Sequence, residues 1–369
     1  MSLQTACSSK ATPKEVAAEI SARIKECDPR LVIFFASAKY DPAQISAELS
    51  AAFSSCVVYG CSTAGELISG AMLKGSVVAM GFGSDIIEDV AVEVIEEIRS
   101  RNDTPKAFAA FEKHFGQSLT ELDIDKHVGL ILVDGLQGAE EKLMEKIGDL
   151  TDIHFIGGSA GDDLAFKKTF VFAHGKSFTN AAILAVLKVK KGFSIIKTQS
   201  FCPMPKTLKA TKVDEATRTV LEFNGKPALT AYAEALGVKE ADAASQFMSH
   251  PLGLLSAEGQ PFVRSPQQIK DQAMVFYCNI KEGMELSLLS STDIVGDTRE
   301  AVLSTVKALG TVEGMINFHC ILRTLELEQK NLTEAYGKVF SAIPTIGFST
   351  YGEEYIGHIN QTSTILVFK

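Results

Sequence analysis

The sequence feature that most constrains the fold is a short motif that occurs near both ends of the chain. Residues 59–67 read YGCSTAGEL and residues 347–354 read GFSTYGEE, so Gly, Ser, Thr, Gly and Glu recur at matching positions. Residues 157–163, GGSAGDD, form a looser third copy. A chain of 369 residues has room for about two domains, and the two closer copies of the motif favour two related modules.

Short β-rich apolar runs outnumber amphipathic helical stretches, and hairpin-like neighbours follow residue 165. This order predicts an α+β fold with two modules of mixed, largely antiparallel sheets and helices packed on them. We expect an N-terminal helix within residues 1–29, a first module over 30–213 and a second over 214–369. Residues 201–214, FCPMPKTLKATKVD, contain two prolines and little periodicity, which predicts a linker.

The composition narrows the classes of partner and location. The net charge is −9 and no dense Lys/Arg block is present, which argues against a nucleic-acid partner. The apolar runs are far shorter than the ~20 residues of a spanning helix, so we expect no membrane span. The first residues do not resemble a secretion signal, which favours a cytoplasmic location. The seven cysteines form no CxxC pair, and we expect thiols rather than disulfides.

The repeated motif contains residue types that can line a polar pocket. Glycine lets the backbone approach a ligand closely, hydroxyls donate and accept, and a carboxylate can hold an amine. The alternative, which spacing alone favours, is that the hydroxyls satisfy their own turn and the glutamate caps a nearby amide. GGSAGDD lacks the lysine of a P-loop and does not match GxGxxG, so nucleotide binding is not predicted.

Catalytic and metal-binding patterns are weak in this sequence. Cys61 lies on the first motif, but no histidine is near it in sequence, and a buried small residue is the alternative to a nucleophile. The seven histidines form no HExxH arrangement, although a single histidine can ligate haem iron. Arg323 ends an apolar stretch, where a guanidinium needs a carboxylate from the protein or from a ligand.

Five motifs, in order, resemble the FIST family, named for F-box and intracellular signal transduction. They are GCSTAGEL at 60–67, GGSAGDDL at 157–164, Phe262-Val263-Arg264, the Cys320 and Arg323 pair, and GFSTYGEEYIGHINQT at 347–362. The resemblance runs from about residue 30 to the C-terminus and implies an N-terminal and a C-terminal FIST module. It further implies a cytosolic sensor of bacterial signal transduction that binds an amino-acid-like metabolite and regulates a separate signalling protein.

The resemblance also leaves a second function open, because some stand-alone family members are haem proteins that sense nitric oxide and modulate a histidine kinase. Where we expect a family pattern close to Ser-Cys-Ile-Gly-Arg, residues 319–323 of this chain read His-Cys-Ile-Leu-Arg, so that His319 takes the place of the serine. The candidate axial ligands are His250, His319 and His358. An enzyme that uses Cys61 or a carboxylate is the weakest hypothesis, and we predict no catalytic residues.

The predicted ligand pocket lies between or within the two modules and collects side chains from the glycine-rich loops, which we expect to meet in space. Its members are Ser62, Thr63, Glu66, Ser159, Asp162, Arg264, Arg323, Tyr351, Glu353, Asn360 and Thr362. Arginine can take a carboxylate bidentately and glutamate can take an ammonium group, which suits an amino-acid-like ligand.

Overall fold

The computed structural model describes residues 2–101 and 103–369, which group into two compact units. The first unit holds the chain up to Lys197 together with Arg299–His358 and Ser363–Lys369, and the second holds Thr198–Thr298 and Ile359–Thr362. These units are discontinuous in sequence, whereas the predicted modules are continuous stretches. The module boundaries after residues 29 and 213 therefore remain predictions made from the sequence.

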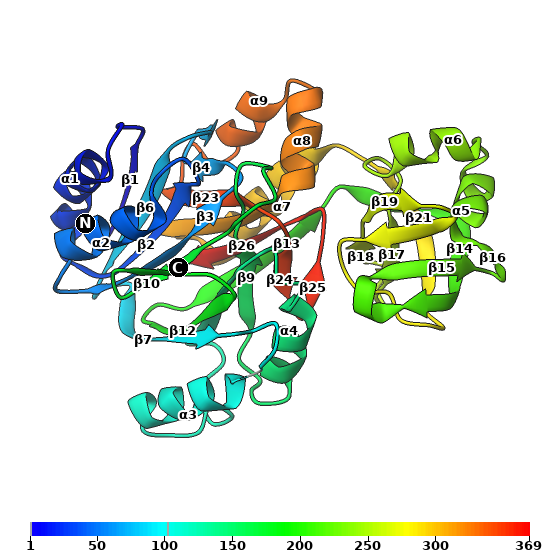
Figure 1. The fold of residues 1–369 in the computed structure, drawn as a ribbon. Coiled ribbons are helices and arrows are strands. Elements are labelled where there is room, and N and C mark those ends of the chain that lie inside the picture. The colour runs from blue at the N-terminus through cyan, green and yellow to red at the C-terminus, as the bar shows by residue number, and fades with distance from the viewer. Residues whose placement is uncertain (1, 102) are drawn as a thin grey trace. The chain divides into compact units, whose positions relative to one another are not determined.

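Three six-stranded sheets form the framework of the first unit (Figure 1). The first sheet has the order β1 (Leu3–Ser8), β6 (Val77–Gly83), β2 (Pro29–Ser37), β3 (Val57–Thr63), β10 (Val171–Ala173), β11 (Lys176–Phe178). The second has the order β7 (Ile87–Glu96), β12 (Ala181–Val189), β8 (His127–Val133), β9 (Phe155–Ser159), β24 (Glu353–Tyr355), β25 (His358–Ile359). The third has the order β13 (Phe193–Gln199), β26 (Thr362–Phe368), β22 (Gly314–Cys320), β23 (Thr345–Thr350), β4 (Glu66–Ile68), β5 (Ala71–Leu73).

Each sheet has the same arrangement, with one parallel pair among antiparallel neighbours. The parallel pairs are β2 with β3, β8 with β9, and β22 with β23. After each pair the chain forms a hairpin that joins a different sheet: β4–β5 joins β23, β24–β25 joins β9, and β10–β11 joins β3. The unit is therefore a cyclic set of three repeats, and the predicted α+β class with mixed, largely antiparallel sheets is confirmed.

The three repeats follow one another along the chain. The first covers residues 3–83, the second 87–189, and the third residues 193–199 with 294–368. In the first two, a short connection leads from the edge strand to the following helix. In the third, the same connection contains most of the second unit, so the second unit is an insertion into the third repeat.

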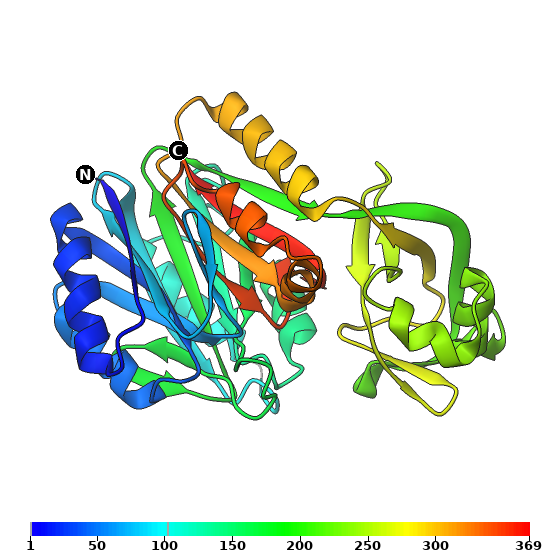
Figure 2. The same ribbon diagram turned by 90° about the horizontal axis from the view of Figure 1, so that it is seen from above.

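Helices cover the outer faces of the sheets. They are α1 (Pro13–Ile24), α2 (Pro42–Ala52), α3 (Thr104–Phe115), α4 (Glu140–Gly148), α7 (Ile294–Leu309), α8 (Ile321–Gln329), α9 (Thr333–Lys338) and the 3₁₀ turn η1 (Lys25–Cys27). Figures 1 and 2 show α1 and α2 together on one face of the first sheet. The predicted start of α1 is confirmed, because Thr12 and Glu15 form a reciprocal capping box before Pro13. No helix of the described residues is long and apolar enough to cross a membrane.

The inner faces of the three sheets share one apolar core. Phe35 from the first sheet contacts Phe318 and Phe348 from the third, with ring centroids 6.3 and 4.5 Å apart. Leu130 and Ile183 of the second sheet belong to the same cluster. Since each strand alternates its side chains, the outer faces form separate cores with the helices.

The second unit is a smaller α+β body. Its strands are β14 (Phe201–Asp214), β15 (Thr219–Phe223), β16 (Lys226–Pro227), β17 (Leu252–Leu255), β18 (Pro261–Arg264), β19 (Pro266–Lys270), β20 (Ala273–Phe276) and β21 (Glu285–Ser291). Its helices are α5 (Ala228–Leu236) and α6 (Glu240–Ala243), with 3₁₀ turns η2 (Glu215–Thr217) and η3 (Ala244–Gln246). Tyr232 and Phe276 lie in its core.

The predicted linker at residues 201–214 is wrong, because these residues form the long strand β14. The strand pairs first with β21 and then with β15. Its prolines misled the prediction: the ladder with β21 is irregular between Pro203 and Thr207, where the missing amide donors can be tolerated.

Candidate functional site

The three glycine-rich loops meet in the first unit, as predicted from the sequence. The amides of Ala64, Gly161 and Tyr351 occupy the same position in the three copies. They donate to the carbonyls of Ser349, Ser62 and Ser159, at 3.2, 3.0 and 3.0 Å. Each motif thus bonds to the next, and the three close a backbone ring.

The first glycine of each motif is required by strand packing. Gly60, Gly157 and Gly347 lie on the second strand of each parallel pair. A Cβ at these positions would lie 1.8, 1.8 and 2.2 Å from a carbonyl oxygen of the neighbouring strand. Only glycine fits, so this residue marks the close approach of two strands rather than of a ligand.

Two motifs contain the same buried Thr–Glu pair. Thr63 Oγ1 donates to Glu66 Oε1, and Thr350 Oγ1 donates to Glu353 Oε1. Glu66 also accepts from the Ser76 amide at 2.9 Å and the Ser76 hydroxyl at 2.6 Å. Burial raises the pKa of Glu66 to about 7, although the bonds from Ser76 and Thr63 oppose it. Glu66 therefore holds its own loop, which is the structural alternative left open by the sequence.

The second motif is organised by two neighbouring aspartates. Asp163 accepts from the Ser37 hydroxyl at 3.0 Å, and burial raises its pKa. Asp162 accepts from the amides of residues 166–168 and from the Tyr351 hydroxyl, the latter at 2.5 Å. The Tyr351 ring stacks on Phe166, with centroids 4.8 Å apart. Tyr351 and Asp162 thus fix the loop that follows the second motif.

Buried acids surround Ser159 and His358. Ser159 Oγ lies 3.1 Å from Glu140 Oε1 and 3.5 Å from Glu354 Oε1, and His358 Nδ1 lies 3.0 Å from Glu354 Oε1. Burial by itself lowers the pKa of His358. The nearby carboxylates of Glu354, Glu140 and Glu141 outweigh this effect and raise the pKa to about 9. Burial raises the pKa of Glu354. The His358–Glu354 contact is therefore a buried pair that retains a proton at neutral pH.

A second buried polar group lies beside β22. Arg323 on α8 is 1% exposed and His319 is fully buried. The His319 Nδ1 atom lies 3.0 Å from the Tyr336 hydroxyl. Burial, followed by the charge of Arg323, holds the pKa of His319 well below its ordinary value. The His319 imidazole is therefore neutral at neutral pH.

The remaining predicted residues lie in the second unit. Arg264 ends β18, and its Nη1 donates to the Val263 carbonyl at 3.2 Å, while Thr362 begins β26 and is buried. Two buried polar atoms, Arg264 Nε and Asn360 Oδ1, have no hydrogen-bond partner among the described residues. His250 Nδ1 lies 3.0 Å from the Ser249 hydroxyl, and burial lowers its pKa.

The environment of Cys61 does not favour a thiolate. Cys61 is fully buried in the apolar core, and burial raises its pKa well above the ordinary value, which opposes a thiolate nucleophile. Among the described residues, no three His, Cys, Asp or Glu side chains are grouped to hold a metal ion. His250 lies in the second unit, whereas His319 and His358 lie in the first, and haem ligation stays a prediction from the resemblance.

The structure thus brings together most of the predicted residues of the first unit, but their side chains bond to other residues of the protein. The sequence reasoning missed Ser37, Ser76, Glu354 and the role of Asp163. Asp163 occupies the position of Glu66 and Glu353, and a strict alignment of the three motifs would have found it. Ser37 and Ser76 carried no sequence signal, because their contacts depend on strands that are distant in the chain.

Comparison with known proteins defines the class. The model of the FIST N domain matches residues 30–226, and that of the FIST C domain matches residues 228–355. The chain therefore belongs to the FIST family, whose domains are sensors in signal transduction. An uncharacterized protein of Methanocaldococcus jannaschii is 26% identical over 203 residues, which cover 51% of this chain and 39% of that protein. The match spans less than half the length of that relative.

Proposed function

We propose that this protein senses a small zwitterionic ligand of the amino-acid class and passes the signal to a separate protein. The observation that carries the proposal is that two of the buried polar atoms without a hydrogen-bond partner in the second unit belong to predicted site residues. Arg264 Nε is a cationic donor and Asn360 Oδ1 is a neutral acceptor, and neither is paired among the described residues. An amino acid offers the complementary groups, a carboxylate for the arginine and an ammonium for the amide oxygen.

A side-chain hydrogen bond shows that the two backbone segments that carry these atoms are close together. Ser265 Oγ donates to Gln361 Oε1 at 2.7 Å, and Gln361 Nε2 donates to the Met248 carbonyl at 2.8 Å. Ser265 follows Arg264 and Gln361 follows Asn360, so the two backbone segments lie side by side. A buried polar atom without a partner costs about 1–3 kcal/mol, and a ligand that pairs with both atoms recovers this energy.

The structure narrows the set of residues that we assign to ligand recognition. Ser62, Thr63, Glu66 and Asp162 already bond to protein groups, so they support the loops. Recognition then rests on Arg264 and Asn360. Binding would act on signalling if the ligand-bound second unit presents a surface to the partner that differs from the unbound one.

The test is a thermal shift screen followed by calorimetry. We expect one group of amino acids, added at up to about 10 mM, to raise the melting temperature. Arg264→Gln and Asn360→Ala should each weaken that ligand at least about tenfold, since each loses a buried polar contact. Arg299→Gln, at an exposed position, is the matched control and should change affinity less than about twofold. The proposal fails if no amino-acid-like compound shifts the wild type, or if Arg264→Gln binds as tightly as the control.

A further inference from the structure

The edge of β7 is an open place for an added strand. β7 pairs with β12 on one side, and no strand of the described residues pairs with its other side. Open edges present unpaired backbone amides and carbonyls, and proteins normally shield them. On β7 one amide is already engaged, because Val90 N donates to Asp89 Oδ1 at 2.8 Å. Here the edge at residues 90–93 lines a cavity of about 770 Å³ in the first unit. The four residues span about 13 Å of extended chain, which is enough to register a short peptide.

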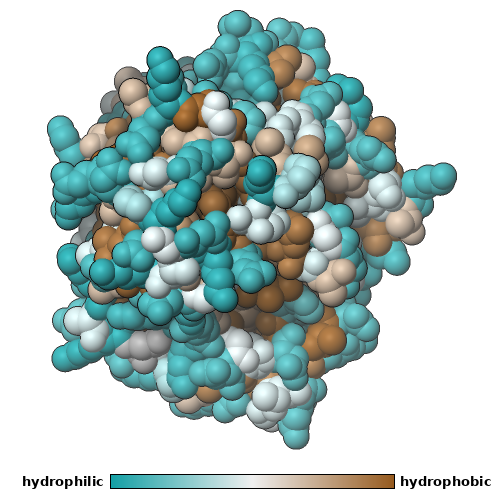
Figure 3. Space-filling model, turned by 90° about the vertical axis from the view of Figure 1, so that its right-hand side faces the viewer, coloured by the Kyte–Doolittle hydropathy of each residue, from teal (hydrophilic) through white to brown (hydrophobic). Residues whose placement is uncertain are grey.

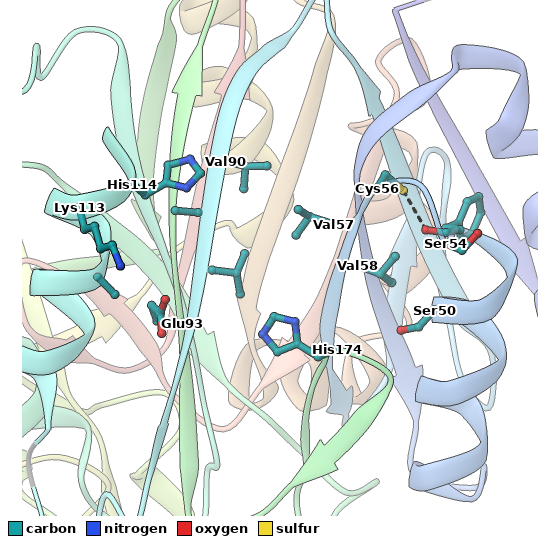
Figure 4. A pocket seen from close by; sticks show the side chains of 14 residues that line it. Ser50, Ser54, Cys56, Val57, Val58, Val90, Glu93, Lys113, His114 and His174 are labelled. Atoms are coloured by element: carbon teal, nitrogen blue, oxygen red, sulfur yellow. Dashed lines mark hydrogen bonds between the residues drawn. The ribbon is translucent and has the colours of Figure 1, made fainter. Parts of the chain in front are cut away.

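The cavity is a groove between two helices and two strands (Figure 4). Val57 and Val58 at the start of β3 form one apolar wall, and Val90 lies on β7 opposite them. Polar and charged side chains surround this apolar floor, and they are Ser50, Ser54, Glu93, Lys113, His114 and His174. Apart from Phe53, the apolar side chains that line the groove are those of alanine and valine, and the small side chains on β7 leave room for a backbone to approach the strand.

Two basic side chains of the groove, Lys113 and His174, are available to an occupant. His114 Nε2 lies 3.1 Å from Asp89 Oδ1 and is already engaged. Lys113 and His174 are exposed. Neither side chain forms a hydrogen bond or ion pair with another described side chain, although Glu93 lines the same groove. A carboxylate on the occupant would complement them. On the surface shown in Figure 3, by contrast, hydrophobic residues fall in several separate areas among hydrophilic ones, which gives no continuous apolar face there.

We propose that the groove binds an extended segment of a partner protein, which adds to β7 as a strand and directs a carboxylate to Lys113 and His174. Small apolar side chains of the segment would cover Val57 and Val90. The fold itself uses this mode of association three times, since each repeat lends a hairpin to the edge of a strand in another repeat. Backbone bonds to β7 supply affinity and the alternate side chains supply specificity. This inference does not depend on ligand binding in the second unit.

The first step of the test is a selection from a displayed library of random decapeptides on the full-length protein. We expect enriched sequences that alternate small apolar residues and carry an acidic residue. The best peptide is then made in a plain form and in a form N-methylated at alternate amides, which keeps the side chains but prevents strand pairing. Fluorescence anisotropy should show that methylation weakens binding at least about tenfold.

Two protein readouts accompany the peptide pair. Cys56 lines the groove, and burial raises its pKa to about 11, so the bound peptide should slow its alkylation further, while exposed Cys7 and Cys202 serve as internal controls. Lys113→Ala combined with His174→Ala should weaken binding several-fold, whereas Lys106→Ala on the same helix should not. The proposal is overturned if no sequence is enriched, if the methylated peptide binds equally well, or if Cys56 stays as reactive as before. Equal binding of the methylated form would indicate a small-molecule groove instead.

Discussion

The first and second repeats carry the same motif on equivalent strands but close it in different ways. In the first, Thr63 and Glu66 form a buried pair and β4 begins at Glu66 itself. In the second, Ala160 has no hydroxyl, Asp163 reaches Ser37 of the first repeat, and residues 164–170 intervene before β10. The backbone ring is thus preserved while the side-chain support changes.

The difference is also seen in the backbone. Asp163, Leu164 and Phe166 have positive φ angles of 54°, 66° and 50°, although none is glycine. Such conformations cost about 1–3 kcal/mol each and persist only where the surrounding structure holds them. Here Asp162 and Tyr351 hold the loop. The loop that follows the second motif is therefore strained and exposed, whereas the corresponding residues 64–67 of the first repeat are buried.

The largest effect is expected where the repeats agree. Gly60→Ala and Gly157→Ala each place a Cβ 1.8 Å from a backbone carbonyl of the paired strand, which cannot move without breaking the parallel pair. We expect a loss above about 4 kcal/mol, or no soluble folded protein, in both cases. Gly116→Ala is the control, because its Cβ meets nothing within 4 Å and its φ of 73° alone should cost about 1 kcal/mol. Urea denaturation measures all three, and unequal effects at Gly60 and Gly157 would break the proposed equivalence.

The next largest effect is the pH dependence of the free energy of unfolding, which should differ between Glu66 and Asp163. The folded-state pKa of Glu66, about 7, lies above its unfolded value, so its contribution is fully present below about pH 4.5 and is lost as the pH rises through 7. The loss amounts to at most about 3 kcal/mol. Glu66→Gln should flatten the free energy of unfolding over this window. Asp163→Asn, at a half-exposed site, should change the pH profile less, and a larger change there would reverse the comparison.

A smaller effect follows from the hydroxyl that the second repeat lacks. Thr63→Val removes the donor to Glu66, and Thr350→Val removes the donor to Glu353. We expect each to cost about 2 kcal/mol at pH 8, because a buried carboxylate loses a partner. For Thr63→Val the cost should shrink at pH 5, where Glu66 is protonated. Thermal unfolding at the two pH values measures both variants, and a cost that does not depend on pH would contradict the role of Thr63.

The smallest effect concerns the strained loop. Leu164→Gly relieves a positive φ at a residue that is 36% exposed, and we expect a change between zero and about 1 kcal/mol of stabilisation. Leu303→Gly is the matched control. Leu303 is 61% exposed on α7, where glycine should destabilise by about 1 kcal/mol. If both variants destabilise equally, the loop stores no strain.

Much of the fold was readable from the sequence, and the reasons are local. The capping box at Thr12 and the alternation of short strands depend on neighbouring residues, so the α+β class and α1 could be predicted. The family motifs could also be recognised. The threefold arrangement could not, because the third repeat is interrupted by the second unit and the second motif replaces Thr with Ala160. The reading of residues 201–214 failed because prolines in a long strand resemble those of a linker.

The sequence by itself determined where glycine, hydroxyl and carboxylate residues recur, whereas the meeting of the three loops was an expectation that the backbone hydrogen bonds of the structure bear out. Only the tertiary structure decided what those side chains do, because hydrogen bonding and burial depend on strands far apart in the chain. Glu66 is a structural group with a pKa of about 7 because Ser76 and the core enclose it. Arg264 and Asn360 are candidates for recognition because the fold buries one polar atom of each and leaves it unpaired among the described residues.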